Sequence, residues 1–383
     1  MLRTLVVSDL HLGAAPGNDV VRHPAMRTSL VDALHDCERL VLLGDVIELR
    51  HGPAHRALEA ARPALREIAA ALRPPRQVVI VAGNHDHQLI APWLERRASV
   101  SGSPLELESA VDWREGELLS AIAVALEPAD VRAAYPGVWL RDDVYATHGH
   151  YSDRHSTVPL LERLGAGLVA RIVGEPRGGP AAVDDYEGAL APMYAFIDGV
   201  VRRRPPKLDP GGETFQVRAW RALSTTNGRF PVRRAALQGG FSLAVAGLNR
   251  FGLGPLRADL SGHALRTGGL YGMQEVVRRL EIPASHVIFG HTHRAGPLPG
   301  DRVEDWKTSS GSLLYNDGSW LLERSFLGWE PGASPYRPGF CVLVSATGPP
   351  EVMNLLDGID LDEAVSLLRE TRGKADGVTA HCR

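Results

Sequence analysis

The sequence has few cysteines, few lysines and no long apolar run. Its three cysteines, Cys37, Cys341 and Cys382, are far apart and form no CxxC pair, which argues against a disulfide framework and against a thiolate zinc site. No apolar run approaches the roughly 18 residues that cross a bilayer, and the first residues read as a strand rather than as a secretory signal. We therefore expect a cytoplasmic protein in a reducing compartment.

The length and composition are those of a large soluble protein. The chain has 383 residues, of which 44% are hydrophobic and 23% charged, which fits a large α/β unit with insertions or two domains. Residues 151–285 carry 18 Lys and Arg against 12 Asp and Glu, and the rest of the chain is net negative. This asymmetry indicates either that the middle segment faces an anionic partner or that it has a solvated helical surface.

Five short apolar segments share a pattern that is typical of buried strands. Each is rich in Val, Ile and Leu and is continuous rather than alternating, as expected for a strand covered on both faces. The segments are residues 4–8, 39–44, 77–83, 144–147 and 286–290. Helical patterns at residues 28–40 and 55–72 separate the first three, and Pro63 is expected to kink or restart the second helix. This order predicts βαβ units around a sheet.

Each of the five predicted strands ends in Asp, Asn or His. The residues concerned are Asp9, His11, Asp45, Asn84, His85, His148, His291 and His293. One such residue after a strand is usually a turn or helix cap. Five strands with the same kind of end are harder to explain by capping. In open α/β sheets, ligand sites lie beyond the carboxyl ends of the strands. We therefore expect these side chains to converge on one place.

The side chains at these strand ends have the chemistry of a transition-metal site. Two carboxylates, one amide oxygen and at least four imidazoles are too rich in nitrogen for magnesium or calcium, and they suit Mn²⁺, Fe²⁺ or Zn²⁺. Seven ligands are too many for one ion that keeps open positions, but they suffice for two ions that share a bridging carboxylate. Two ions about 3.5–4 Å apart can clamp the attacking and leaving oxygens of a phosphoryl transfer.

The motifs SDLHLG, GDVIE, GNHDH, THGH and GHTH resemble, in this order, the five blocks of calcineurin-like metallophosphoesterases. The resemblance covers roughly residues 1–150 and 286–350. It implies an α/β (α+β) fold, a four-layer metallophosphoesterase-type β-sandwich flanked by helices. It also implies a hydrolase of phosphoric ester or diphosphate bonds, in which a bridging hydroxide attacks at a dinuclear metal centre. Manganese is the expected metal, with iron or zinc as alternatives.

The resemblance also implies a role for each residue of the motifs. Asp9, His11 and His293 would hold one ion. Asn84, His148 and His291 would hold the other, and Asp45 would bridge the two. His85 would lie over the leaving-group oxygen and act as a general acid or stabilise developing charge. Asp86 would orient His85, because an imidazole needs an acceptor that fixes its tautomer. The family pattern places the fourth-block ligand before the glycine, which favours His148 over His150; His150 could contact phosphate or cap a turn.

The motifs divide the chain into a core and an insertion. We expect residues 1–150 and 286–355 to form the metallophosphoesterase core, residues 151–285 a mainly helical insertion or lid, and residues 356–383 a C-terminal helix and tail. Within the second part of the core, residues 312–323 predict a hairpin that turns around Asn316, Asp317 and Gly318, and residues 339–346 predict a further strand.

The insertion is expected to select the substrate, an anionic phosphoester. Its positive charge, apolar faces and aromatic residues suit a lipid-linked nucleotide or a phospholipid headgroup, which implies peripheral contact with the inner face of a membrane. Alternatively, its apolar residues only pack the insertion against itself. The motifs and the helical insertion are similar to UDP-2,3-diacylglucosamine pyrophosphohydrolases, although those usually have HGD where this chain has HGH.

Two other functions remain alternatives. A nuclease would need a long basic groove, and only the insertion is basic, so nucleic acid is not the expected partner. A non-catalytic scaffold on the same fold would have lost ligands, whereas every ligand position of this chain is filled.

Overall fold

The computed structural model describes residues 2–14, 18–100, 104–155, 178–203, 262–327 and 331–360. The chain forms two compact units. The first unit comprises residues 1–149, 283–306 and 311–383, and the second unit comprises residues 150–282 and 307–310. Residues 361–383 of the predicted C-terminal helix and tail, and much of the predicted insertion, lie outside the described residues.

The first unit is built on a ten-stranded sheet with the order β10-β9-β1-β2-β3-β5-β6-β7-β8, in which β4 pairs with β5. The strands are β1 (Thr4–Val7), β2 (Arg39–Leu43), β3 (Gln77–Val81), β4 (Glu108–Ala110), β5 (Asp130–Arg141), β6 (Val144–Thr147), β7 (His286–Phe289), β8 (Leu313–Asn316), β9 (Phe340–Val344) and β10 (Glu351–Asn354). All five strands predicted from apolar runs are present, β9 is the further predicted strand, and the predicted α/β fold class is confirmed.

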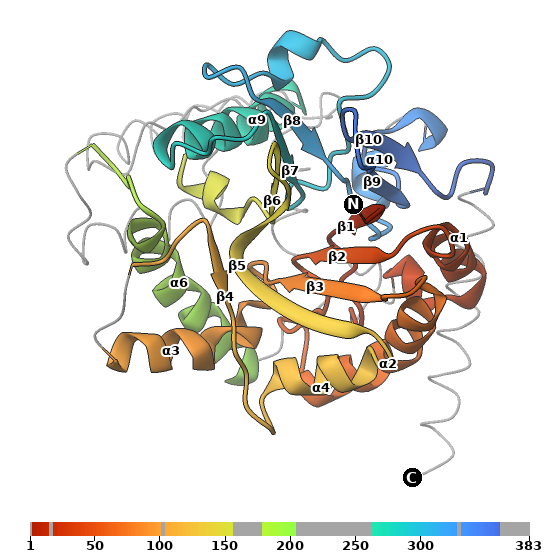
Figure 1. The fold of residues 1–383 in the computed structure, drawn as a ribbon, viewed down its shortest axis with the longest axis vertical. Coiled ribbons are helices and arrows are strands. Elements are labelled where there is room, and N and C mark those ends of the chain that lie inside the picture. The colour runs from red at the N-terminus through yellow and green to blue at the C-terminus, as the bar shows by residue number, and fades with distance from the viewer. Residues whose placement is uncertain are drawn as a thin grey trace, which may run out of the picture. The chain divides into compact units, whose positions relative to one another are not determined.

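The sheet folds over on itself along β5, a strand that sequence analysis missed. The first half of β5 pairs in parallel with β3, and its second half pairs antiparallel with β6. Pro136 and Gly137 lie between the two halves, and a Cβ on Gly137 would come within 2.3 Å of the Tyr145 hydroxyl. Figure 1 shows β5 curving from β3 towards β6. The curve produces two facing layers of strands, as in a sandwich.

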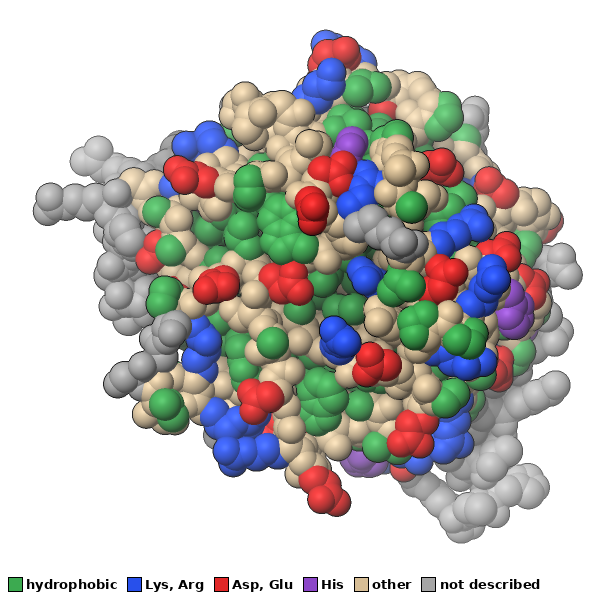
Figure 2. Space-filling model, viewed as in Figure 1, with side chains coloured by type: hydrophobic (Ala, Val, Ile, Leu, Met, Phe, Trp, Pro, Cys, Tyr) green, Lys and Arg blue, Asp and Glu red, His purple; other side chains and the backbone are tan. Residues whose placement is uncertain are grey.

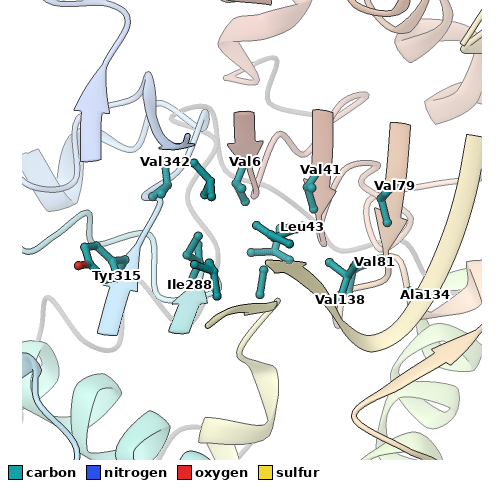
Figure 3. Packing of buried hydrophobic residues seen from close by; sticks show 14 residues of the cluster. Val6, Val41, Leu43, Val79, Val81, Ala134, Val138, Ile288, Tyr315 and Val342 are labelled. Atoms are coloured by element: carbon teal, nitrogen blue, oxygen red, sulfur yellow. The ribbon is translucent and has the colours of Figure 1, made fainter. Parts of the chain in front are cut away.

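The hydrophobic core fills the space between the two layers. Val6, Val41 and Val79 point from β1, β2 and β3 towards side chains such as Ile288 of β7 and Tyr315 of β8 (Figure 3). All five are buried. Full burial of such a side chain contributes about 1.5–3 kcal/mol, so the layers are held together along their whole contact. The strand ends that carry the polar motifs are thereby fixed in space.

Helices cover the strands of the first layer. Helix α2 (Ala54–Ala71) contacts both α1 (Pro24–Leu34) and α4 (Leu118–Ala125), and the three lie beside β2 and β3 in Figure 1. The expected restart at Pro63 is wrong, because α2 runs through this residue as one helix. Its buried stripe, which includes Ala61 and Leu65, continues on both sides of the proline, so packing outweighs the lost backbone hydrogen bond. Helices α3 (Ala91–Ser99) and α10 (Arg324–Leu327) complete the α-helices described in this unit.

The predicted hairpin after β8 is wrong. The chain leaves β8 at Asn316 and turns into the protein instead of pairing back on itself. The Asp317 N–H donates to the Phe289 carbonyl, and the Trp320 N–H donates to the Asp9 carbonyl. The residues that looked like a turn are buried because they bind the ends of β7 and β1.

The described part of the second unit is helical. It consists of the short helix η3 (His150–Arg154), α6 (Val183–Arg203) and α9 (Gly262–Arg279). The rings of Tyr151 and Tyr186 stack with their centroids 4.8 Å apart, which joins η3 to α6. A Cβ on Gly272 would lie 2.7 Å from the Ser152 carbonyl oxygen, so the glycine allows α9 to approach η3 closely.

The surface of the described residues mixes both signs of charge. On the face drawn in Figure 2, acidic and basic side chains are interspersed among apolar ones. None of the helices in the described ranges combines the length and the apolar character that crossing a bilayer requires.

Candidate metal centre

The structure brings all seven predicted metal ligands together at the strand ends of the first unit. The loop after β1 is tied to the loop after β2, since Asp9 N–H donates to the Gly44 carbonyl and His11 N–H donates to the Asp45 carbonyl. On the other layer, the Gly290 N–H donates to the His148 carbonyl. Backbone hydrogen bonds between neighbouring loops therefore set the spacing of the motifs.

The backbone at the ligands is strained. Seven non-glycine residues with positive φ occur in the described parts of the chain, and five of them are predicted ligands: Asp9, His11, Asp45, His291 and His293. Such conformations cost free energy and persist where the surrounding structure enforces them, often at functional sites. This strain is evidence for a functional site that does not depend on the identity of the side chains.

Asp9, His11 and His293 form what we term the first donor set. Asp9 Oδ1 lies 3.1 Å from His293 Nε2 and 3.7 Å from His11 Nε2, and the two imidazole nitrogens are 3.4 Å apart. Ligands about 2.0–2.2 Å from one ion lie about 3–3.5 Å from each other, so this triangle has the size of a coordination sphere. Asp9 Oδ1 is buried and accepts no hydrogen bond from the described residues, which fits an oxygen built to face a cation.

Asn84, His148 and His291 form the second donor set. Asn84 Oδ1 lies 3.2 Å from His148 Nε2 and 3.1 Å from His291 Nδ1. His148 Nδ1 donates to the Leu43 carbonyl over 2.8 Å, which leaves the lone pair of the neutral ring on Nε2. Oxygen and nitrogen lone pairs thus converge on one point, as in the first donor set.

Asp45 lies between the two donor sets. Its Oδ2 is 3.8 Å from His11 Nε2 and 3.4 Å from His148 Nε2. Its Oδ1 accepts the His85 backbone N–H over 2.8 Å, which fixes the rotation of the carboxylate. A carboxylate oxygen in this position suits a ligand that two cations share.

The electrostatics of the buried carboxylates call for positive charge at the site. Burial would raise the pKa of Asp45, but His148 and His85 outweigh it and hold this pKa below its usual range. Burial would likewise lower the pKa of His148, but Asp45 and Asp9 raise it to about 10. Without cations, the raised pKa of His148 lets a proton on its ring supply positive charge, and a divalent ion can replace that proton.

Glu48, which the sequence analysis did not assign, supports both His85 and His11. Its Oε2 accepts hydrogen bonds from His85 Nδ1 over 2.9 Å and from His11 Nδ1 over 3.0 Å. Burial would raise the pKa of Glu48, but His85 and His11 hold it well below its usual range. The side chain of His85 remains 27% exposed, so solvent or substrate can reach it. The only feature of the sequence that could have indicated this supporting role is the position of Glu48, three residues after Asp45 in the GDVIE motif.

Asp86 does not orient His85, and this part of the prediction is corrected. Both of its carboxylate oxygens accept backbone N–H groups, from Gly83 over 2.6 Å and from Val46 over 2.8 Å. Asp86 therefore ties the loop after β3 to the loop after β2 and acts on the backbone of the site. Burial and the Asp45 charge raise its pKa to about 6.

The other two histidines of the motifs pack against tyrosine rings. His87 is buried with its ring edge-on to Tyr135, at a centroid distance of 6.1 Å. His150 belongs to the second unit, where its ring packs against Tyr151 and Tyr194.

Comparison with known proteins agrees with this geometry. No curated protein matches the chain. The calcineurin-like phosphoesterase family model matches residues 2–170, which contain four of the five motif blocks. The fifth block, GHTH, lies outside the matched residues and reaches the same site through β7. Residues 2–170 are therefore similar to the calcineurin-like phosphoesterases, and the Asp, His and Glu groups at the strand ends could hold metal ions.

Proposed function

We propose that this protein hydrolyses a phosphomonoester, phosphodiester or pyrophosphate bond with the help of two divalent cations. The first donor set would hold one cation and the second donor set would hold the other. The position of Asp45 Oδ2 between His11 and His148 is the observation that carries the proposal. When bound, two such ions lower the pKa of a water molecule and neutralise phosphate oxygens. The mixture of carboxylate, amide and imidazole donors favours Mn²⁺, with Fe²⁺ or Zn²⁺ as alternatives.

His85 is the group that serves the leaving oxygen. Glu48 occupies Nδ1 of its ring, so Nε2 remains to hold or donate a proton at the substrate. The buried Glu48 carboxylate accepts from Nδ1 and so fixes the tautomer and the orientation of the ring, as a general acid requires. Glu48 acts only through His85 and His11 and is a positioning residue.

The substrate is proposed to be an anionic phosphoester, with a lipid-linked nucleotide as the first candidate. The support is the net positive charge and the aromatic content of residues 151–285, of which residues 156–177 and 204–261 lie outside the described ranges. A screen of the purified enzyme against nucleotides, cyclic nucleotides, phospholipids and UDP-linked lipids tests this candidate. Salt-sensitive binding of DNA would favour the nuclease alternative instead.

The metal requirement is tested on the full chain, purified without chelators. We expect uptake of about two manganese ions per chain and hydrolysis of bis-p-nitrophenyl phosphate, both lost in Asp45→Asn because this variant weakens both cation sites. The matched control is Asp130→Asn, which makes the same change at an exposed carboxylate at the start of β5. Only trace uptake of manganese, iron and zinc by the wild-type protein would overturn the proposal.

A further inference from the structure

A buried hydrogen-bonded chain that the proposed mechanism does not use lies behind the first donor set. Ser8 and Asp317 are fully buried, although they come from opposite ends of the sequence. The Ser8 hydroxyl contacts Asp9 Oδ2 and lies 2.7 Å from Asp317 Oδ1. Asp9 Oδ2 also accepts the His291 backbone N–H over 2.9 Å. With Oδ2 engaged in this way, Oδ1 is the Asp9 oxygen left to face the first donor set.

The number of protons shared by Asp317, Ser8 and Asp9 determines which group donates each hydrogen bond. A serine hydroxyl has one proton and cannot donate to two carboxylates at once. Asp9 Oδ1 lies 3.1 Å from His293 Nε2 and 3.7 Å from His11 Nε2, and Asp9 Oδ2 accepts the His291 backbone N–H, so the Asp9 carboxylate acts as an acceptor. Asp317 has no ion pair in the described parts of the chain, and its Oδ2 has no hydrogen-bond partner there. A buried carboxylate without a partner is unfavourable, so the proton belongs on Asp317.

The direction of the hydrogen bonds follows from this count. A protonated Asp317 donates to the Ser8 oxygen, and Ser8 donates its own proton to Asp9 Oδ2. Burial and the nearby Asp9 charge, which raise the pKa of Asp317, agree with this order.

The segment that carries Asp317 also holds the main chain around the site. The Trp320 N–H and the Ser319 hydroxyl donate to the Asp9 carbonyl over 3.1 Å and 3.3 Å. The Asn316 amide donates to the Gly290 carbonyl over 2.9 Å. Residues 316–320 therefore contact both the loop after β1 and the loop after β7.

Gly290 shows how closely these parts are packed. A Cβ on Gly290 would lie 2.1 Å from the Ser8 hydroxyl oxygen and 2.6 Å from Asp9 Oδ2. A larger residue at this position would displace the side chains that form the hydrogen bonds from Asp317 through Ser8 to Asp9.

We infer that Asp317 is a positioning residue for the metal centre, acting as a neutral donor through Ser8 to fix which oxygen of Asp9 faces the first donor set. The inference rests on the proposed function, because it assigns Asp9 Oδ1 to a cation. It does not make Asp317 a ligand.

The sharpest test compares Asp317→Asn with Asp317→Ala. The asparagine amide is neutral and can donate to Ser8, so we expect Mn²⁺ affinity and hydrolysis of bis-p-nitrophenyl phosphate within about threefold of wild type. The alanine variant removes the donor and should lower Mn²⁺ affinity by about 10–100-fold, as loss of a partner behind a metal ligand does. Calorimetric titration with Mn²⁺ alone measures affinity. Mass spectrometry checks the amide for deamidation, since glycine follows it.

A double-mutant cycle tests the path through Ser8. Ser8→Ala removes the hydroxyl that links Asp317 to Asp9 and should weaken Mn²⁺ binding as Asp317→Ala does. The Mn²⁺ affinity of the double variant should be no lower than that of either single variant. Additive losses would mean that Asp317 does not act through Ser8. If Asp317→Ala fails to fold, Ser8→Ala and Asp317→Asn still decide the question.

Two further measurements separate positioning from general stability and from failure of the proposed function. Leu314→Ala leaves a cavity in β8 outside the hydrogen-bonded chain and should lower thermal stability without changing Mn²⁺ affinity. The infrared band of a buried carboxylic acid should be present in wild type and absent in Asp317→Asn. A wild type that binds no metal defeats the proposed function. If the wild type binds metal and hydrolyses substrate but Asp317→Asn is as impaired as Asp317→Ala, only the inference about Asp317 is wrong.

Discussion

The two donor sets of the metal centre have the same number of imidazoles but different charges. The first set has a carboxylate from Asp9, whereas the second has the neutral amide oxygen of Asn84. The carboxylate that ion-pairs with His148 of the second set is that of Asp45, which both sets share. A divalent cation is attracted more strongly by a set with its own negative charge. We therefore expect the first set to bind its ion more tightly, and the second to depend on Asp45.

The sets also differ in what supports their imidazoles. His11 of the first set donates its Nδ1 proton to the Glu48 carboxylate, while His148 of the second set donates to the backbone carbonyl of Leu43. A carboxylate makes the imidazole a stronger ligand than a carbonyl does. Because Glu48 also binds His85, the first set is coupled to the proton donor. The difference indicates that charge and proton chemistry are concentrated on one side of the centre.

Asp9→Asn breaks this comparison most directly, because it gives the first set the same neutral amide as the second. Loss of a partner behind a ligand typically costs 10–100-fold, so for a ligand itself we expect hydrolysis to fall by about 1,000-fold. Manganese titration should show that the tighter of two binding events has weakened. Unchanged tight binding with only the weaker event lost would mean that the assignment of the two sets is reversed.

The fold and the ligands could be predicted from sequence to different degrees. Each of β1, β2, β3, β6 and β7 contains a continuous apolar run, such as residues 77–81 of β3, that is long enough to predict a strand. The polar residue types at the ends of these runs identified the metal donors. By contrast, β5 contains Pro136 and polar residues in its first half, so it lacks an apolar run. Its role as the strand that joins two layers depends on pairing with distant segments, which no local pattern encodes.

Supporting residues could not be assigned for a related reason. Asp86 is adjacent to His85 in sequence, yet it binds backbone N–H groups, and the partner of His85 is Glu48 from another loop. Likewise, Asn316 and Asp317 have the composition of a turn, and their burial against the ends of β7 and β1 appears only in three dimensions. Donor chemistry is a property of residue type, whereas hydrogen-bond partnership depends on the fold.

His85→Ala sharpens the comparison by separating proton chemistry from metal binding. The variant removes the general acid and should lower the rate of hydrolysis by about 100-fold. Both cations should remain, because the His85 side chain belongs to neither donor set. Metal analysis of the purified variant beside a kinetic assay with bis-p-nitrophenyl phosphate checks both expectations. A variant that loses one ion together with its activity would make His85 a ligand.

The smallest expected effect is that of Glu48→Gln, which tests whether support by a carboxylate distinguishes the first set. The amide keeps the size of the side chain and removes its charge, so His11 loses the partner that strengthens it as a ligand. We expect the tighter Mn²⁺ affinity to fall by about tenfold, the weaker affinity to stay as in wild type, and the rate to fall because His85 loses its acceptor. Calorimetric titration resolves the two affinities, and Glu67→Gln, the same change at the exposed partner of Arg27, is the control. Equal weakening of both affinities would show that Glu48 acts on the site as a whole and that the two donor sets are not supported differently.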